Sequence, residues 1–218
     1  MQSKPFKIRA FGPMACFARP ETMVDRESYE VMTPSAARGV FEAILWKPAI
    51  RWHVHEIAVL RPVAWVSLRH DEVPGQAAPR GGGDFAEGAS RRRQGNTVAL
   101  RDVDYVITAS FVMTDQAKPT DKVAKFERMF AQRMAKGQRH HAPSLGEREF
   151  LALVQPAPEE VTPIEVGVDR PLGRMFYDVE HRTGHRGRPF FFEARLTGGV
   201  LHVPSWEQVL REHAAAGG

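Results

Sequence analysis

The sequence has very little cysteine and no long hydrophobic run. Its single cysteine, Cys16, excludes an internal disulfide framework and fits a reducing cytoplasm. A membrane-spanning helix needs about 20 predominantly apolar residues, and no stretch of the sequence meets that requirement. The opening segment MQSKPFKIRAF contains no long apolar region and no signal-peptide cleavage pattern. We therefore expect a cytoplasmic protein with no membrane partner.

The sequence also lacks the compact motifs of several enzyme classes. It has no CxxC, no HExxH and no acidic cluster with the spacing of metal ligands, so we expect neither a metal nor another cofactor. The glycines at 81–83 are not followed by the Gly-Lys-Ser/Thr of a phosphate-binding loop. GxSxG is absent, and no motif marks Cys16 as a nucleophile.

The clearest element that the sequence predicts is a helix over residues 33–46. Thr33 suits the N-cap because its hydroxyl can accept a hydrogen bond from the first turn, and Pro34 fits the first helical position. Lys47 is expected in the last turn, where a cation suits the helix dipole, and Pro48 prevents continuation. Residues at helical spacing form one apolar face: Ala37, Val40, Phe41, Ile44 and Leu45.

The order of the predicted elements indicates an α+β fold. Strands are predicted at 5–11, 51–61, 64–69, 97–114 and 150–154, and a second helix runs from 120 or 121 to about 135 and ends at Gly137. This order predicts a ferredoxin-like (RRM-like) domain over 1–155, with a long, basic, glycine-rich loop at about 71–96.

The remainder of the chain predicts a second, smaller unit. After a proline-rich linker at 155–163, strands are expected at 175–180, 189–196 and 200–203, with Gly198 and Gly199 forming a hairpin. A short helix is expected at 206–216. Residues 164–218 are therefore predicted to form a small antiparallel β-sheet domain.

Positive charge is concentrated in one segment, although the net charge of the whole chain is only +4. Residues 118–148 contain eight basic side chains: Lys118, Lys122, Lys125, Arg128, Arg133, Lys136, Arg139 and Arg148. Three acidic residues, Asp121, Glu127 and Glu147, oppose them. One interpretation is a solvated helix face. The other is a groove for RNA phosphates, with Arg91, Arg92 and Arg93 as a second arm.

The residue types in this segment would suit metal-independent RNA cleavage. In that reaction the RNA's own 2′-hydroxyl attacks the adjacent phosphate. A protein must accept the 2′ proton, protonate the leaving 5′ oxygen and offset the charge of the phosphorane. Histidine titrates near neutral pH and suits the first two roles, and Lys or Arg suits the third. His140, His141, Lys125 and Lys136 are side chains of these types.

A resemblance to a known family covers nearly the whole chain. The stretch 28–52, SYEVMTPSAARGVFEAILWKPAIRW, resembles the signature of the CRISPR-associated RAMP proteins of type I-C systems, the fifth Cas family, subtype d (also called c). Further matching motifs follow in order: FGPMACFARPE, RHDEV, RRQGNTVALRDVDY, KGQRHHAPSLGEREF, LGRMFYD and FFFEARLTGGVLHVP.

The resemblance implies an activity and partners. Members of this family cut CRISPR precursor RNA at the base of the repeat hairpin without a metal, which leaves a 2′,3′-cyclic phosphate. They then stay on the 5′ handle of the mature crRNA beside the backbone and large subunits of the surveillance complex. The resemblance therefore implies an endoribonuclease, and the alternative is a non-catalytic subunit that binds the crRNA handle.

The resemblance also implies site residues. The family pattern has a tyrosine before Trp-Lys-Pro, where this chain has Leu45, and a Lys-His pair at the start of the second helix, which falls at Lys125 and Phe126. His141 matches a histidine common in other members and is the expected acid or base. The expected catalytic set is Lys125 and His141, with His140 and Tyr29 in reserve. The expected RNA-binding residues are Arg91, Arg92, Arg93, Lys47, Arg51, Arg128, Arg133, Lys136 and Arg139.

Overall fold

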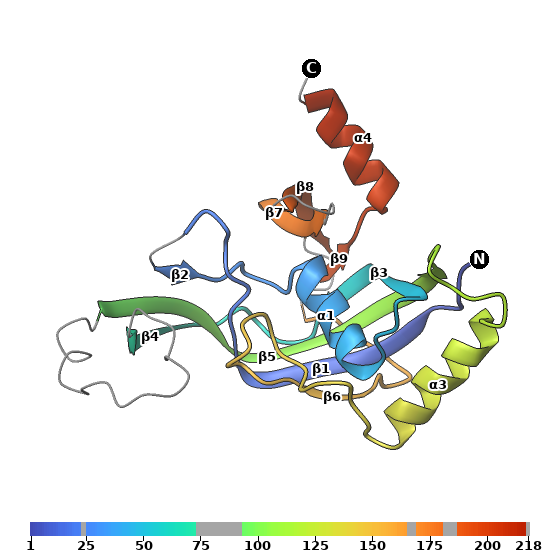
Figure 1. Cartoon of the computed structure of the whole chain (residues 1–218). Coiled ribbons are helices and arrows are strands. Elements are labelled where there is room, and N and C mark those ends of the chain that lie inside the picture. Colours follow the sequence, from blue (N-terminus) through green and yellow to red (C-terminus); the bar gives the residue numbers. More distant parts are fainter. Residues whose placement is uncertain (23–24, 73–92, 165–168, 181–186, 217–218) are drawn as a thin grey trace, which may run out of the picture.

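The computed structural model describes residues 1–22, 25–72, 93–164, 169–180 and 187–216, which form the predicted α+β fold (Figure 1). The main sheet has the strand order β6-β1-β5-β3-β9-β8-β7, and β2 and β4 pair with β5. The strands are β1 Phe6–Ala15, β2 Arg26–Glu27, β3 Ile50–Val59, β4 Trp65–Glu72, β5 Arg93–Met113, β6 Leu153–Pro156, β7 Arg170–Glu180, β8 Arg188–Thr197 and β9 Val200–His202. The helices are α1 Pro34–Ile44, α3 Val123–Ala135 and α4 Trp206–Ala216.

Helix α1 begins as predicted but ends earlier. The Thr33 hydroxyl accepts a hydrogen bond from the Ala36 amide, which confirms the N-cap. The helix ends at Ile44, and Leu45 is extended. Pro48 only limits how far the helix could run, because a proline at a helical position would clash with the carbonyl four residues earlier. The prediction that Lys47 lies in the last helical turn is therefore wrong, and Lys47 follows the helix in a turn.

The core lies where α1 and α3 pack on the same face of the sheet. Trp52 of β3 is only 2% exposed. Its ring lies 4.8 Å from Phe41 of α1, 4.9 Å from Phe130 of α3 and 5.2 Å from Phe111 of β5, between ring centroids. The Trp52 indole also donates to the Leu45 carbonyl at 3.0 Å. This tryptophan therefore fixes both helices and the turn that follows α1.

The predicted loop at 71–96 is too long. Strand β5 begins at Arg93, four residues before the expected strand, and β4 pairs with it as far as Glu72. Backbone pairing between strands does not need apolar side chains. The end of β4 and the start of β5 therefore have no apolar pattern that would have predicted them from the sequence. Figure 1 shows this part of β5 extending away from the helices. Arg91 and Arg92 lie outside the described residues, and Arg93 is placed by its backbone opposite Glu72.

Other boundaries moved by a few residues. Strand β6 lies at Leu153–Pro156 rather than 150–154, so it takes up the start of the predicted linker, and β7 begins at Arg170 rather than 175. Helix α3 begins at Val123 with Lys122 as its N-cap, because the Asp121 carboxylate accepts from the Lys118 amide and from the Lys125 ammonium instead. The Gly198-Gly199 hairpin and the helix at 206–216 are confirmed.

The C-terminal strands continue the N-terminal sheet. Strand β9 pairs with the second half of β3, with Glu56 opposite His202. The Arg38 guanidinium of α1 also makes two hydrogen bonds of 2.9 Å to the Asp178 carboxylate of β7. These contacts join the two predicted units, and their division into separate domains stays a prediction.

The lone cysteine should be unreactive in the folded protein. Cys16 is fully buried, and burial raises the pKa of its thiol to about 11. At pH 8 only about one thiol in a thousand is then ionised, and the thiolate is the reactive form. We expect Ellman's reagent to label Cys16 quickly in 6 M guanidinium and far more slowly in buffer. Equal rates in the two solvents would contradict this burial.

Candidate functional site

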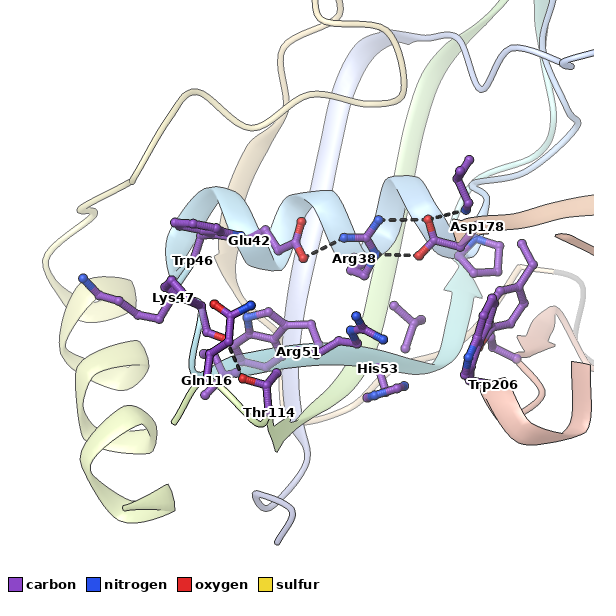
Figure 2. A pocket seen from close by; sticks show the side chains of 18 of the residues that line it. Arg38, Glu42, Trp46, Lys47, Arg51, His53, Thr114, Gln116, Asp178 and Trp206 are labelled. Atoms are coloured by element: carbon purple, nitrogen blue, oxygen red, sulfur yellow. Dashed lines mark hydrogen bonds and ion pairs between the residues drawn. The ribbon is translucent and has the colours of Figure 1, made fainter. Parts of the chain in front are cut away.

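A groove with a volume of about 490 Å³ runs along α1. It lies between α1 and β3, and it is closed at one end by β7 and the start of α4 (Figure 2). The other end is formed by the turn after α1 and by residues 114–116 after β5. This volume is typical of a small-ligand site, and it suits one or two units of a polymer.

The floor of the groove is an open sheet edge. Strand β9 pairs with β3 only over Glu56–Ala58, and the Val203 amide donates to the His55 carbonyl. Pro204 then turns the chain into α4. Over the described residues, Arg51–Val54 of β3 pair with β5 on one side and with no strand on the other. The backbone edge of this segment is therefore open to the groove, and the Arg51 side chain is exposed there.

A tryptophan stands at each end of the groove. Trp46 follows α1 and is 48% exposed. Trp206 begins α4 and packs 4.9 Å from Phe190 and 5.7 Å from Tyr177, between ring centroids. Figure 2 shows the two indoles at opposite ends, with the Arg51 side chain between them. Accessible aromatic rings provide surfaces on which nucleobases stack.

The groove contains one arginine that is paired with carboxylates and two cations that are not. Arg38 is paired with Asp178 and also donates to Glu42 at 2.6 Å. Lys47 and Arg51 form no ion pair with any residue that the structure describes. Both cations can therefore bind an anionic ligand. Burial lowers the pKa of His53, and the nearby Arg51 charge lowers it further, so this imidazole is neutral at pH 7.

The two adjacent histidines are held against the end of α1. The amides of His140 and His141 point at the Ala43 carbonyl, at 2.6 Å and 3.4 Å, and Arg133 donates to the Ile44 carbonyl at 2.7 Å. The last carbonyls of a helix lack partners within the helix, so this segment serves as the C-terminal cap of α1. The cap stacks the His140 ring on Trp46, with centroids 5.9 Å apart and planes 14° apart.

Comparison with known proteins identifies the family. The family model described as CRISPR-associated protein (Cas_Cas5) matches residues 6–204. The chain belongs to this Cas5 family. The resemblance drawn from the sequence motifs is thereby confirmed.

Relatives of this Cas5 chain align along nearly its whole length. A protein of Thermus thermophilus named CRISPR pre-crRNA endoribonuclease Cas5d is 39% identical over 217 residues, which cover 91% of each chain. A protein of the same name from Mannheimia succiniciproducens is 38% identical over 94% of this chain and 98% of the relative. A solved structure described as "Crystal Structure of CRISPR-associated Protein" covers 95% of both chains with 25% identity and a TM-score of 0.73.

The structure brings together only part of the expected catalytic set of this Cas5 chain. His140 and His141 are both exposed, with ring centroids 5.8 Å apart, at the Trp46 end of the groove. Lys125 lies ten residues before the end of α3, which is about 15 Å along the helix axis. Its ammonium binds the Asp121 carboxylate at 2.8 Å. Lys125 is therefore remote from the histidines.

Tyr29 is in a different environment. Its side chain is 1% exposed, and its hydroxyl accepts a hydrogen bond from the Phe176 amide of β7 at 3.1 Å. Burial raises the pKa of this hydroxyl. A buried hydroxyl that is already bonded to the backbone cannot readily exchange protons with RNA, so its position argues against the catalytic role predicted for Tyr29.

The predicted RNA-binding residues divide into two groups. Arg133 and Arg139 donate to backbone carbonyls, Arg139 to Gln138 and Val154, and so they support the fold. Four basic side chains form no ion pair within the described part of the chain and can meet phosphates: Lys47, Arg51, Arg128 and Lys136. The side chain of Arg93 is not among those described, like those of Arg91 and Arg92.

Three residues that line the groove were not predicted from the sequence as binding residues: Trp46, His53 and Trp206. A usable signal existed for Trp46, because a large aromatic residue outside the apolar stripe of a helix is often a contact residue. No local signal marks His53 or Trp206, since their position depends on where β9 leaves β3.

Among the described residues, no group of three or more His, Cys, Asp or Glu side chains could hold a metal ion. Within the same residues, no helix is long and apolar enough to cross a membrane.

Proposed function

We propose that this protein is an endoribonuclease that cuts CRISPR precursor RNA within the repeat, and that the cut strand lies in the groove beside α1. The single observation that carries the proposal is the His140 ring stacked on Trp46, which lines the same groove as the cations Lys47 and Arg51. The names of the relatives, pre-crRNA endoribonuclease, support the same substrate.

The proposed reaction uses side chains and needs no metal. One histidine of the His140-His141 pair accepts the proton of the 2′-hydroxyl, whose oxygen attacks the adjacent phosphorus. The other donates a proton to the 5′ oxygen as its bond to phosphorus breaks. Lys47 and Arg51 offset the charge on the phosphorane. The products are a 2′,3′-cyclic phosphate and a 5′-hydroxyl.

We propose that the product RNA stays bound to the protein after the cut. The protein remains on the 5′ handle of the crRNA, in the cytoplasm, as a subunit of the type I-C complex beside its backbone and large subunits. The basic side chains on α3, Arg128 among them, would hold phosphates of the hairpin.

The alternative function is a non-catalytic subunit that binds the crRNA handle. It is favoured by the side chains that replace the family's catalytic pattern. Leu45 stands in the tyrosine position and is fully buried, and Phe126 stands in the histidine position and is 3% exposed. Neither side chain can transfer a proton.

The groove belongs to a unit that we describe as ferredoxin-like. The sheet order β6-β1-β5-β3, with antiparallel neighbours, supports this description. In the chain, α1 lies between β1 and β3, and α3 lies between β5 and β6. We place the boundary with a small β-sheet domain between residues 155 and 164.

The activity is tested with the repeat RNA of the protein's own CRISPR array in the presence of EDTA. We expect one cut at the base of the hairpin, with a cyclic phosphate on the 5′ fragment. A repeat with a single 2′-deoxy substitution at the cleavage nucleotide should bind equally well and remain intact. Tight, salt-dependent binding without a cut would support the alternative, and intact RNA at saturating protein would exclude the nuclease.

A further inference from the structure

A second group of aromatic and basic side chains lies on the outward face of β7 and β8. We name it the arginine–aromatic strip, and it consists of Phe176, Phe191 and Arg174 on these strands, together with Arg19 from the segment between β1 and β2. Both phenylalanines are half-buried, and their rings meet edge to face with centroids 5.9 Å apart. They come from the LGRMFYD and FFFEARL motifs, to which the proposed nuclease reaction gives no role.

Arg19 forms one end of the strip. Its guanidinium carbon lies 4.4 Å from the centroid of the Tyr29 ring. Its Nε is buried without a hydrogen-bond partner, and it forms no ion pair with any described residue. A buried guanidinium donor without a partner is costly.

Arg174 forms the other end. Its guanidinium carbon lies 4.5 Å from the centroid of the Phe191 ring, and the residue is exposed. Glu193 stands opposite it on β8, yet the structured part of the chain gives Arg174 no ion pair. Stacking on an aromatic face leaves the edge donors of the guanidinium free for a phosphate.

A series of contacts connects the two ends. Arg19 covers the Tyr29 ring, the Tyr29 hydroxyl accepts from the Phe176 amide, Phe176 contacts Phe191, and Phe191 lies under Arg174. Both arginines are also close enough to Tyr29 to oppose the effect of burial on its pKa. The two ends of the strip are therefore linked through the Tyr29 side chain, which is itself only 1% exposed.

The strip shares a strand with the groove. Asp178 lines the groove, and Arg174 lies four residues earlier on β7, which corresponds to about 13 Å of strand. Half-exposed aromatic rings on a sheet, flanked by arginines, are the surface on which unpaired nucleobases stack while phosphates are neutralised.

We infer that the arginine–aromatic strip is a second binding site for single-stranded RNA, distinct from the groove in which the strand is cut. It stacks bases on Phe176 and Phe191, and it binds phosphates through Arg19 and Arg174. The inference rests on the proposed RNA substrate but not on cleavage, because the strip contains no group that could transfer a proton at neutral pH.

The test measures binding of a fluorescent 15-nucleotide oligouridylate and of the uncleavable 2′-deoxy repeat RNA. Arg19→Gln and Arg174→Gln should each raise the Kd for oligouridylate about tenfold. The slope of log K against log salt is negative. In the double variant it should become less negative by about 1.4, because each phosphate that is no longer neutralised removes about 0.7 from its magnitude. Phe176→Leu should also weaken binding, because it keeps apolar volume and removes the stacking face.

Control variants separate binding from folding and from catalysis. Arg211→Gln removes the same charge from α4, outside the strip, and should change the Kd less than twofold. Glu193→Gln removes the acid opposite Arg174 and should tighten binding about twofold, a gain that misfolding cannot produce. All strip variants should cut repeat RNA at the normal rate when protein is saturating.

The outcomes separate this inference from the proposed function. If oligouridylate binding and its salt slope are unchanged in the double variant and in Glu193→Gln, the strip does not bind RNA, whatever the cleavage assay shows. If the protein binds oligouridylate through the strip but never cuts repeat RNA, the inference stands and the nuclease proposal fails.

Discussion

Replacing His140 and His141 together by alanine should lower the single-turnover rate of repeat cleavage by about 10²- to 10⁴-fold. At 1.36 kcal/mol per tenfold change, this is about 2.7–5.4 kcal/mol of transition-state stabilisation. The physical reason is that both proton transfers depend on this pair. Stopped-flow or quench-flow cleavage at saturating protein measures the effect without a contribution from binding.

The two histidine side chains can be removed without removing the cap of α1. The capping groups are the backbone amides of residues 140 and 141, and alanine keeps them. RNA affinity should therefore change little, and the melting temperature should stay within a few degrees. The matched control is His202→Ala, which removes an exposed histidine far from α1 in sequence and leaves the rate normal.

A second control separates this site from the family pattern. Lys125 occupies the pattern's lysine position but lies at the far end of α3 and is paired with Asp121. Lys125→Ala should therefore lower the cleavage rate less than about tenfold. A loss of 10³-fold or more from Lys125→Ala, with normal cleavage by the histidine variant, would move the active centre to the start of α3.

Replacing Trp52 by alanine should destabilise the fold by about 3–5 kcal/mol, which is typical for truncating a buried large aromatic side chain. Trp52 is 2% exposed and contacts rings on α1, α3 and β5. Since domains are stable by only about 5–15 kcal/mol, this one change removes a large share. Urea unfolding followed by circular dichroism gives the difference.

Two matched variants show which part of Trp52 matters. Trp52→Phe keeps most of the ring contacts but loses the hydrogen bond to the Leu45 carbonyl, and it should cost about 1–3 kcal/mol. Trp65→Ala removes another tryptophan, which is 43% exposed on β4, and should cost less than about 1 kcal/mol. Equal losses from Trp52→Ala and Trp65→Ala would contradict the core described above.

Local signals in the sequence were sufficient to predict the start of α1. A capping threonine, a proline at the first helical position and an apolar stripe act within a few residues, so the start of the helix is confirmed at Thr33 and Pro34. The helix ends at Ile44, two residues before the predicted end, and the Ala43 and Ile44 carbonyls accept from residues 140 and 141 and from Arg133, which are tertiary contacts that no local signal reveals.

The groove could not be predicted from local signals. It exists because β9 stops pairing with β3 at Glu56 and leaves Arg51–Val54 open, and this depends on a strand about 150 residues later in the chain. The adjacency of His140 and Trp46 is likewise a tertiary contact. Sequence motifs identified the family and the histidines, whereas the geometry added Trp46, Trp206 and the separation from Lys125.

The central claim is that the strand is cut in the groove beside α1, and photocrosslinking of a trapped complex tests it most directly. Repeat RNA would carry the 2′-deoxy substitution at the cleavage nucleotide and 4-thiouridine immediately after the scissile phosphate. Mass spectrometry should find the crosslink in residues 46–53 or 136–141. Crosslinks confined to residues 118–126 or to the arginine–aromatic strip would contradict the claim.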